Sequence, residues 1–245
     1  MNSYPDKKLL AIDLDGTILT DAGILTPANG KALATIVADP YYVVCIATGR
    51  DVDSAVSFFS EFGITGLHVV SSGGAIIDAE DGHAWRSFPI PEPISEELKK
   101  THLEHTIQEH RVRGTQELIK VALLNQTEED AYWLGNEVDE GEGMDGLRAD
   151  VTPILGSDLF AVDVLAKGVD KASSVEQVAW LHSIYWKDII AIGDAENDKS
   201  MMDKASYSLC IGDRMSDCAD VKFPAAEKGG FSRAIAHLRK EHDRE

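Results

Sequence analysis

The chain of 245 residues has only three cysteines, few basic residues and no hydrophobic run that approaches the ~20 residues of a membrane span. Three cysteines make no disulfide framework, so we expect reduced thiols, with Cys45 and Cys210 in apolar strands and Cys218 in a helix. The first residues, MNSYPDKK, include no apolar segment of the kind found in signal peptides. These absences predict a soluble, cytoplasmic protein.

Positive charge is scarce, because 23 lysine and arginine residues stand against 42 aspartate and glutamate residues, for a formal net charge of −19. Nucleic acid backbones attract clustered lysine and arginine, so this balance argues against a nucleic acid partner. A small anionic substrate would need local positive charge, from a metal ion or a placed lysine, to enter such a field. We expect a small-molecule partner, no membrane partner, and a monomer or homodimer.

Short apolar runs recur along the chain, and each is closed by small or polar residues. The runs that we interpret as strands cover residues 9–15, 41–49, 67–74, 188–198 and 207–213. They are continuous rather than alternating, which is typical of strands buried on both faces of a parallel sheet. Helical spacing of apolar residues predicts the intervening helices 27–38, 51–62 and 169–183. This alternation predicts an α/β fold with a doubly wound, Rossmann-like parallel sheet.

One segment breaks this rhythm. Residues 75–88 are typical of two strands around an Asp81-Gly82 turn, and PIPEP at 89–93 is typical of a stiff linker. The elements expected beyond it are a helix at 95–110, a strand at 117–124, a helix at 127–138, and strands near 147–153 and 159–165. We therefore predict a smaller α+β cap domain at 90–165, inserted into a catalytic core of 1–89 and 166–245.

Polar side chains gather where the predicted strands end, which is where ligands bind in open parallel sheets. These residues are Asp13 and Asp15, then Thr48, Gly49 and Arg50, and finally Asp194, Asn197 and Asp198. Carboxylates that converge in one crevice repel each other strongly if they are left bare. Mg²⁺ would resolve this repulsion, since it binds a few carboxylates and leaves its other sites to water and phosphate oxygens.

Each motif alone also has an ordinary structural interpretation. DxDGT fits a strand end followed by a glycine turn, Thr48-Gly49 fits a common turn, and GDAEND fits a helix N-cap with an acidic first turn. Lys171 follows a predicted N-cap at Asp170, where a cation opposes the helix dipole. A solvent-facing lysine is the alternative, and Lys167 is a competing candidate. The carboxylates elsewhere favour a phosphate-binding role for Lys171.

The sequences DLDGT, ATGR, GVDKA and GDAEND resemble, in order, the four motifs of the haloacid dehalogenase superfamily of phosphohydrolases. The insertion between the second and third motifs resembles that of the Cof-like branch. The resemblance covers the predicted core. One departure is Ser72, in SSGGA, at a position where family members often have asparagine.

The resemblance implies a Mg²⁺-dependent phosphatase that hydrolyses a small phosphorylated metabolite, of the sugar phosphate or phosphoglycolate type, through an aspartyl-phosphate. Asp13 would be the nucleophile, and Asp15 the general acid and then the general base. The implied metal ligands are Asp13, the carbonyl of Asp15, Asp194 and Asp198. The residues implied or placed to bind the phosphoryl group are Thr48, Gly49, Arg50, Lys171 and Asn197.

The cap adds candidates whose roles the sequence leaves open. Three arginines are candidates for binding the leaving group, with simple surface solvation as the alternative: Arg86, Arg111 and Arg113. Three histidines on a predicted helix lack a metal-binding spacing and are interpreted as surface residues: His102, His105 and His110. Four tryptophans are interpreted as packing residues rather than stacking platforms: Trp85, Trp133, Trp180 and Trp186.

Two other functions stay open. A phosphomutase or phosphotransferase would pass the same aspartyl-phosphate to a sugar hydroxyl instead of water. A non-catalytic phosphometabolite-binding protein would keep the fold but should have lost a carboxylate or the lysine. None of these residues is missing from the sequence.

Overall fold

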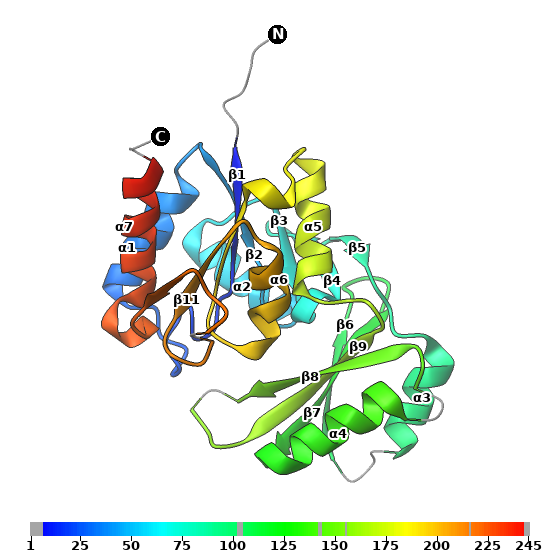
Figure 1. Ribbon diagram of the computed structural model, residues 1–245. Helices are drawn as coiled ribbons and strands as arrows, with labels where there is room; N and C mark the ends of the chain where they lie inside the picture. Colours follow the sequence, from blue (N-terminus) through cyan, green and yellow to red (C-terminus); the bar gives the residue numbers. More distant parts are fainter. Residues whose placement is uncertain (1–6, 102–104, 142–143, 155, 216, 243–245) are drawn as a thin grey trace. The chain divides into compact units, whose positions relative to one another are not determined.

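The computed structural model describes residues 7–101, 105–141, 144–154, 156–215 and 217–242. The chain divides into two compact units, coloured by sequence in Figure 1. Unit 1 consists of Met1–Ala47 and Val175–Glu245, and unit 2 of Thr48–Ser174. Helix α5 (Lys171–Leu181) runs through the second boundary. The division into core and cap proposed from the motifs uses other boundaries and stays a prediction.

Unit 1 is built on a five-stranded parallel sheet with the strand order β12-β11-β10-β1-β2. Its strands are β1 (Lys8–Ile12), β2 (Tyr42–Ile46), β10 (Ile189–Gly193), β11 (Tyr207–Ile211) and β12 (Val221–Phe223). Strands β1 and β10 are almost entirely buried, as their continuous apolar sequences predict for strands covered on both faces. The predicted parallel α/β sheet is confirmed, and β12 is a strand that the apolar runs did not reveal.

Helices flank this sheet. In Figure 1, α1 (Pro27–Val37) and α7 (Gly230–His242) lie side by side, and α6 (Lys199–Lys204) packs against β10 and β11. Helix α1 begins where Thr26 accepts a hydrogen bond from the Asn29 amide, with proline in the first turn. Its buried residues recur at helical spacing and form one face. The short 3₁₀ helices are η2 (Trp186–Asp188), η3 (Glu196–Asp198) and η4 (Ala226–Lys228).

Unit 2 begins with α2 (Val52–Phe62), a predicted helix that Asp51 caps and Gly63 ends in a left-handed conformation. A three-stranded antiparallel sheet follows, formed by β3 (Leu67–Val70), β4 (Ala75–Asp78) and β5 (Ala84–Ser87). The two strands predicted around Asp81-Gly82 are confirmed. The prediction of a parallel-sheet strand at 67–74 is wrong, because the 3₁₀ turn η1 (Ser71–Gly73) reverses the chain and pairs β3 with β4.

The second sheet of unit 2, here called the cap sheet, is antiparallel with the order β6-β7-β9-β8. Its strands are β6 (Thr106–Arg111), β7 (Leu118–Gln126), β8 (Leu147–Pro153) and β9 (Phe160–Ala166), and its helices are α3 (Glu92–Thr101) and α4 (Glu128–Glu140). Helix α4 buries Ala131, Leu134, Gly135 and Val138, which recur at helical spacing. They share an apolar core with cap sheet residues such as Val121 and Val162. The predicted α+β unit is confirmed.

One predicted cap helix extends too far. Residues 95–110 were expected to be helical, but α3 ends at Thr101 and residues 106–111 form β6, which pairs with β7. Strand β6 is an edge strand with mostly exposed polar side chains, so it lacks the apolar alternation that would have indicated a strand. Its conformation is decided by backbone pairing with a strand that comes later in the chain.

Two smaller predictions are also corrected. The predicted linker 89–93 ends inside α3, because Glu92 and Pro93 form its first turn, where proline costs no hydrogen bond. Cys218 lies in a bend rather than a helix, whereas Cys45 and Cys210 lie in buried strands as predicted. Within the described parts of the chain, no helix has the length and apolar character needed to cross a membrane.

Candidate active site

The central feature of unit 1 is the point where the connections between its strands change direction. From β1 the chain passes to β2 on one side, and from β10 it passes to β11 on the other. Asp13 follows β1 and Asp194 follows β10, and the Asp13 amide donates to the Ile192 carbonyl over 2.9 Å. A crevice at such a switch point is where open α/β sheets bind ligands.

Three buried carboxylates meet at this point. One oxygen each from Asp13, Asp194 and Asp198 lies within 4.8 Å of the others, and all three side chains are at most 5% exposed. Like charges this close repel one another, and a bound cation would relieve the repulsion. Hard oxygen donors in this number suit Mg²⁺, which takes few protein ligands and keeps water or phosphate in its remaining sites. The donor set therefore fits the predicted ion.

Asp198 also has a structural role. Its Oδ2 accepts hydrogen bonds from the amides of Asp194 (2.9 Å) and Ala195 (3.1 Å), so it fixes the loop that carries Asp194. A Cβ on Gly193 would lie 2.6 Å from this carboxylate, which explains the glycine at that position. The N-cap interpretation of GDAEND therefore describes real hydrogen bonds and coexists with the carboxylate cluster.

The glycine and threonine of DLDGT position the side chain of Asp194. Gly16 has φ +89°, and a Cβ there would lie 2.4 Å from Asp194 Oδ2. Thr17 Oγ1 donates to Asp194 Oδ1 over 2.8 Å. The first motif thus supplies Asp13 and also the space and the hydrogen bond that orient a carboxylate 177 residues further along the chain. Asp15, which is half-buried, forms an isolated backbone bridge with Leu19.

Arg214 is a member of this site that the sequence analysis missed. Its Nη1 donates to Asp194 Oδ2 (2.9 Å), and its Nη2 donates to Asp21 Oδ2 (2.8 Å). Burial alone would lower the pKa of Arg214, but the two carboxylates outweigh it and raise that pKa above its ordinary value. Arg214 follows β11, so applying the strand-end rule to that strand as well would have found it.

The residues predicted from ATGR form one loop in unit 2. Thr48 is fully buried, its amide donates to the Val69 carbonyl (3.0 Å), and its Oγ1 accepts from the Arg50 amide (3.2 Å). The Thr48 carbonyl accepts from the Ser72 amide over 3.0 Å. A Cβ on Gly49 would lie 3.3 Å from Ser72 Oγ, so the loop packs closely on the turn that follows β3.

Lys171 begins α5 and is only 1% exposed, whereas the competing Lys167 is exposed. The predicted N-cap is confirmed, because Asp170 Oδ1 accepts from the Ser173 amide over 2.7 Å. Asn197 is half-buried in η3. The structure thus unites three predicted carboxylates in unit 1, while the ATGR loop and Lys171 belong to unit 2.

The candidate arginines of the cap make contacts within unit 2. Arg111 pairs with Glu109 (2.7 Å) and donates to the Gln116 carbonyl, and Arg113 contacts Asp53 and the Asp81 carbonyl. Arg86 is exposed and lies over the Phe88 ring. These contacts do not test whether the three arginines bind substrate, so that role stays a prediction.

One of the three histidine predictions is wrong. His110 lies on β6 and is buried, and its Nδ1 lies 3.0 Å from Ser71 Oγ, so it is not a surface residue of a helix. Burial lowers the pKa of His110 to about 4, with a further contribution from the charge of Lys120. His105 is half-buried just before β6. His102 lies outside the described residues.

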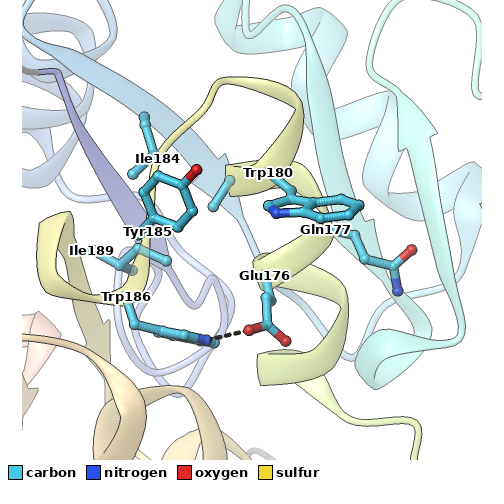
Figure 2. Close-up of a pocket in the computed structure, with 8 residues that line it drawn as sticks. Glu176, Gln177, Trp180, Ile184, Tyr185, Trp186 and Ile189 are labelled. Atoms are coloured by element: carbon cyan, nitrogen blue, oxygen red, sulfur yellow. Dashed lines mark hydrogen bonds between the residues drawn. The ribbon is translucent and has the colours of Figure 1, made fainter.

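Three of the four tryptophans are not the packing residues that we expected. Trp85, Trp133 and Trp180 are exposed, and the half-buried Trp186 donates from Nε1 to Glu176 Oε1 over 2.7 Å. Trp180 and Trp186 line a cavity of about 370 Å³ in unit 1 (Figure 2). The cavity reaches Ile189, the first residue of β10, which is ~16 Å along the strand from Asp194. It is therefore separate from the carboxylate cluster.

The sheet topology and the acidic cluster define an α/β protein with three buried carboxylates at the topological switch point. A family model for haloacid dehalogenase-like hydrolases matches residues 10–129 and 91–235, and the chain belongs to this family. The family resemblance predicted from the four motifs is confirmed, and the chain is an enzyme of the hydrolase class.

Individual relatives support the same assignment. The chain is 23% identical to the 5-amino-6-(5-phospho-D-ribitylamino)uracil phosphatase YitU of Bacillus subtilis (strain 168), covering 93% of this chain and 96% of the relative. It is 23% identical to the HMP-PP phosphatase of Serratia proteamaculans (strain 568), covering 85% of each. A haloacid dehalogenase-like hydrolase from B. subtilis has the same fold, with a TM-score of 0.78, 17% identity, and coverage of 94% and 99%.

Proposed function

We propose that this enzyme is a Mg²⁺-dependent phosphatase that hydrolyses a small phosphorylated metabolite through an aspartyl-phosphate. The observation that carries the proposal is the cluster of Asp13, Asp194 and Asp198 at the switch point of the sheet. Bound there, Mg²⁺ would offset the charge of the carboxylates and of the phosphoryl oxygens. Its ligands would be these three side chains and the carbonyl of Asp15.

Asp13 is the proposed nucleophile. Its carboxylate attacks phosphorus, the bond between phosphorus and the leaving oxygen breaks, and Asp15 protonates the leaving alkoxide. Water then attacks the aspartyl-phosphate while Asp15 accepts its proton, which releases inorganic phosphate and restores Asp13. The burial of Asp13 and the greater exposure of Asp15 support this assignment, since a general acid and base must exchange protons with solvent.

Asp194 and Asp198 are proposed to differ in role. Asp198 Oδ2 accepts two amide hydrogen bonds, which fix the side chain beside Asp194, and we propose that it contacts the ion directly or through water. Asp194 is oriented by the hydrogen bond from Thr17, so its position is set before any ion binds. This preorganisation supports a ligand role for Asp194.

The phosphoryl oxygens are proposed to contact Thr48, Gly49, Arg50, Lys171 and Asn197. This assignment follows the order of the sequence motifs. The burial of Lys171 supports it, because a buried ammonium requires negative or strongly polar groups around it.

The substrate class follows from the named relatives. The B. subtilis relative is named for a phospho-D-ribityl compound and the Serratia relative for HMP-PP, both small phosphorylated molecules. We propose a substrate of the sugar phosphate or phosphoglycolate type, and a cytoplasmic monomer or homodimer with no nucleic acid or membrane partner. The net charge of −19 supports the absence of a nucleic acid partner.

Phosphate release tests the proposal. The full chain should hydrolyse an aryl phosphate with Mg²⁺ and stop in excess chelator, and a screen of phosphorylated metabolites should identify its substrate. Asp13→Asn should reduce turnover by at least about 10⁴-fold, since the nucleophile is lost. The control Asp53→Asn, which changes an exposed carboxylate, should keep full activity.

Three results would contradict parts of this proposal. Full activity of Asp13→Asn, or undiminished activity in chelator, would exclude the mechanism. Transfer of phosphate to an added acceptor sugar in preference to water would indicate a phosphotransferase. Tight phosphometabolite binding without turnover would indicate a binding protein.

A further inference from the structure

Unit 2 contains a buried ion pair that the proposed chemistry does not use. Lys120 on β7 and Asp163 on β9 are each 4% exposed, and Lys120 Nζ lies 2.9 Å from Asp163 Oδ2. Both residues interrupt apolar strands, LIKVALLNQ and FAVDVLA. Charged side chains are seldom fully buried without a specific role, because their desolvation costs as much as their mutual attraction returns.

The pair lies on one particular face of the cap sheet. The opposite face carries Val121 and Val164, which belong to the apolar core with α4. In the strand register, Lys120 stands beside His110 of β6, and Asp163 stands beside Asp150 of β8. We call this row the charged face of the cap sheet. The buried charged side chains on this face need hydrogen-bond partners outside the sheet.

Those partners are the ATGR loop and the turn after β3. Lys120 Nζ donates to the Gly49 carbonyl over 2.9 Å, in addition to its contact with Asp163. Ser72 Oγ donates to Asp163 Oδ2, also over 2.9 Å. The ion pair therefore holds the loop at Gly49 from one side and the turn at Ser72 from the other.

The turn itself has an unfavourable backbone. Ser71 and Ser72 have φ values of +53° and +56°, in the left-handed region that favours glycine, and Gly73 has φ +110°. Such conformations persist where the surroundings hold them, often at functional sites. Here the Ser71 amide donates to the Arg50 carbonyl, and the Ser72 amide donates to the Thr48 carbonyl.

The same turn also contacts the start of α5. Ser174 Oγ donates to the Gly73 carbonyl over 2.7 Å, and a Cβ on Gly73 would lie 2.3 Å from the Asp170 carbonyl oxygen. Helix α5 begins with Lys171. The turn therefore joins, within unit 2, the two segments that carry the proposed phosphate contacts.

We propose that Lys120 and Asp163 are positioning residues, which hold the Thr48–Arg50 loop, and through Ser72 the start of α5, in the arrangement that binds phosphate. This inference rests on the proposed phosphatase function. The ammonium of Lys120 fixes the peptide plane that joins Gly49 to Arg50, and the Ser72 amide fixes the plane that joins Thr48 to Gly49. Preorganised donors of this kind avoid reorganisation when charge develops on the phosphoryl group. The neutral, buried His110 supports the turn from the same face through Ser71.

A comparison of three variants separates positioning from simple stabilisation. Lys120→Met breaks the pair and leaves Asp163 buried and unpaired. Lys120→Met/Asp163→Leu replaces both charges with apolar groups of similar size, which often restores stability. Val121→Ala, the matched control, removes buried apolar contacts from the opposite face of β7. For each variant kcat, KM, inhibition by inorganic phosphate and the thermal midpoint are measured with Mg²⁺.

We expect Lys120→Met to lower both the thermal midpoint and kcat/KM, the latter by about 10 to 100-fold, since small displacements of binding groups have effects of this size. The double variant should regain the midpoint but keep the loss in kcat/KM, with phosphate inhibition weakened about tenfold. Val121→Ala should lower the midpoint and keep kcat/KM within about threefold of wild type.

A double variant with wild-type kcat/KM and phosphate inhibition would overturn the proposal. If Lys120→Met does not fold, the double variant and Ser72→Ala answer the same question, because Ser72→Ala removes only the hydrogen bond to Asp163. If the wild-type chain hydrolyses no phosphomonoester, the phosphatase proposal fails. Calorimetric binding of inorganic phosphate to the same variants then still decides whether the pair positions the loop.

Discussion

Each unit of this protein contains a cluster of buried charged side chains, but the two clusters differ in their ratio of negative to positive charges. In unit 1, three carboxylates meet within 4.8 Å, and the arginine that contacts Asp194 is itself 43% exposed. In unit 2, Lys120 and Asp163 are matched one to one at 2.9 Å. The first cluster could hold a cation, as the proposed function requires, whereas the second is suited to holding neighbouring segments in place. Buried charge therefore has two proposed uses in this protein, which are binding an ion where one sign is in excess and positioning a loop where the signs are matched.

After loss of the nucleophile itself, the largest effect should come from filling the space beside the acidic cluster. In Gly16→Ala the new Cβ would meet Asp194 Oδ2, and φ +89° is strained for alanine, so the carboxylate must move. We expect phosphatase activity to fall about 10²- to 10³-fold. Gly23→Ala is the matched control, with φ +70° but no atom within 4 Å, and should cost only about 1 kcal/mol of stability. Equal activity losses in the two variants would contradict the argument.

Neutralising one carboxylate in each cluster should have opposite effects on stability. Without metal, Asp13→Asn relieves repulsion and should raise the free energy of unfolding by about 1 kcal/mol. Asp163→Asn leaves Lys120 without its counter-charge and should lower it by about 3 kcal/mol. Urea unfolding in chelator measures both, with wild-type m-values as the check on two-state behaviour. A loss of stability in both variants would show that the acidic cluster is as balanced as the ion pair.

Acid should destabilise the charged face of the cap sheet through His110. Its folded pKa of about 4 lies below the ordinary histidine value of 6.5, so the folded state binds fewer protons than the unfolded state between these pH values. The free energy of unfolding therefore falls as pH falls from 6.5 toward 4. His110→Asn should remove about 2 kcal/mol of this loss between pH 6.5 and 4.5.

The comparison with wild type isolates His110 from its neighbours. Burial raises the pKa of Asp150 to about 6, so this carboxyl group contributes with the opposite sign in the same window. Because Asp150 titrates in both proteins, its contribution cancels in the difference. Parallel pH profiles of unfolding for wild type and His110→Asn would contradict the prediction.

The smallest effect concerns Arg214. Its guanidinium contacts Asp194 and so opposes binding of a cation at the acidic cluster. Arg214→Met should lower the Mg²⁺ concentration for half-maximal activity by a factor of about 2 to 5, since the arginine is partly exposed and screened. The control Arg233→Met changes an arginine of α7 that follows none of the strand ends. A higher Mg²⁺ requirement in Arg214→Met would indicate that Arg214 assists the site instead.

Much of unit 1 was predictable, because its signals are local. Continuous apolar runs indicated β1, β2, β10 and β11, and the strand-end rule selected Asp13 and Asp194 before their proximity was known. In unit 2, the N-cap of α5 at Asp170 was likewise predicted from adjacent residues alone. Arg214 was missed only because the rule was not applied to β11.

Unit 2 was harder to predict, because its decisive contacts join segments far apart in the chain. Strand β6 has no apolar alternation and exists because β7 supplies its hydrogen bonds. His110 is buried for the same reason. Lysine and aspartate inside apolar strands were visible in LIKVALLNQ and FAVDVLA, but their pairing depends on the register across β7 and β9.

The amino-acid sequence by itself determined strands β1, β2, β10 and β11, the N-cap at Asp170, the family and the candidate residues of the acidic site. These depend on side-chain periodicity and on short motifs, in which the interacting groups lie within a few residues of one another. Only the tertiary structure decided that Gly16 and Thr17 orient Asp194, that Arg214 joins them, and that Lys120 holds the ATGR loop. Such contacts form when distant segments pack together, and their energies depend on distances that no local pattern encodes.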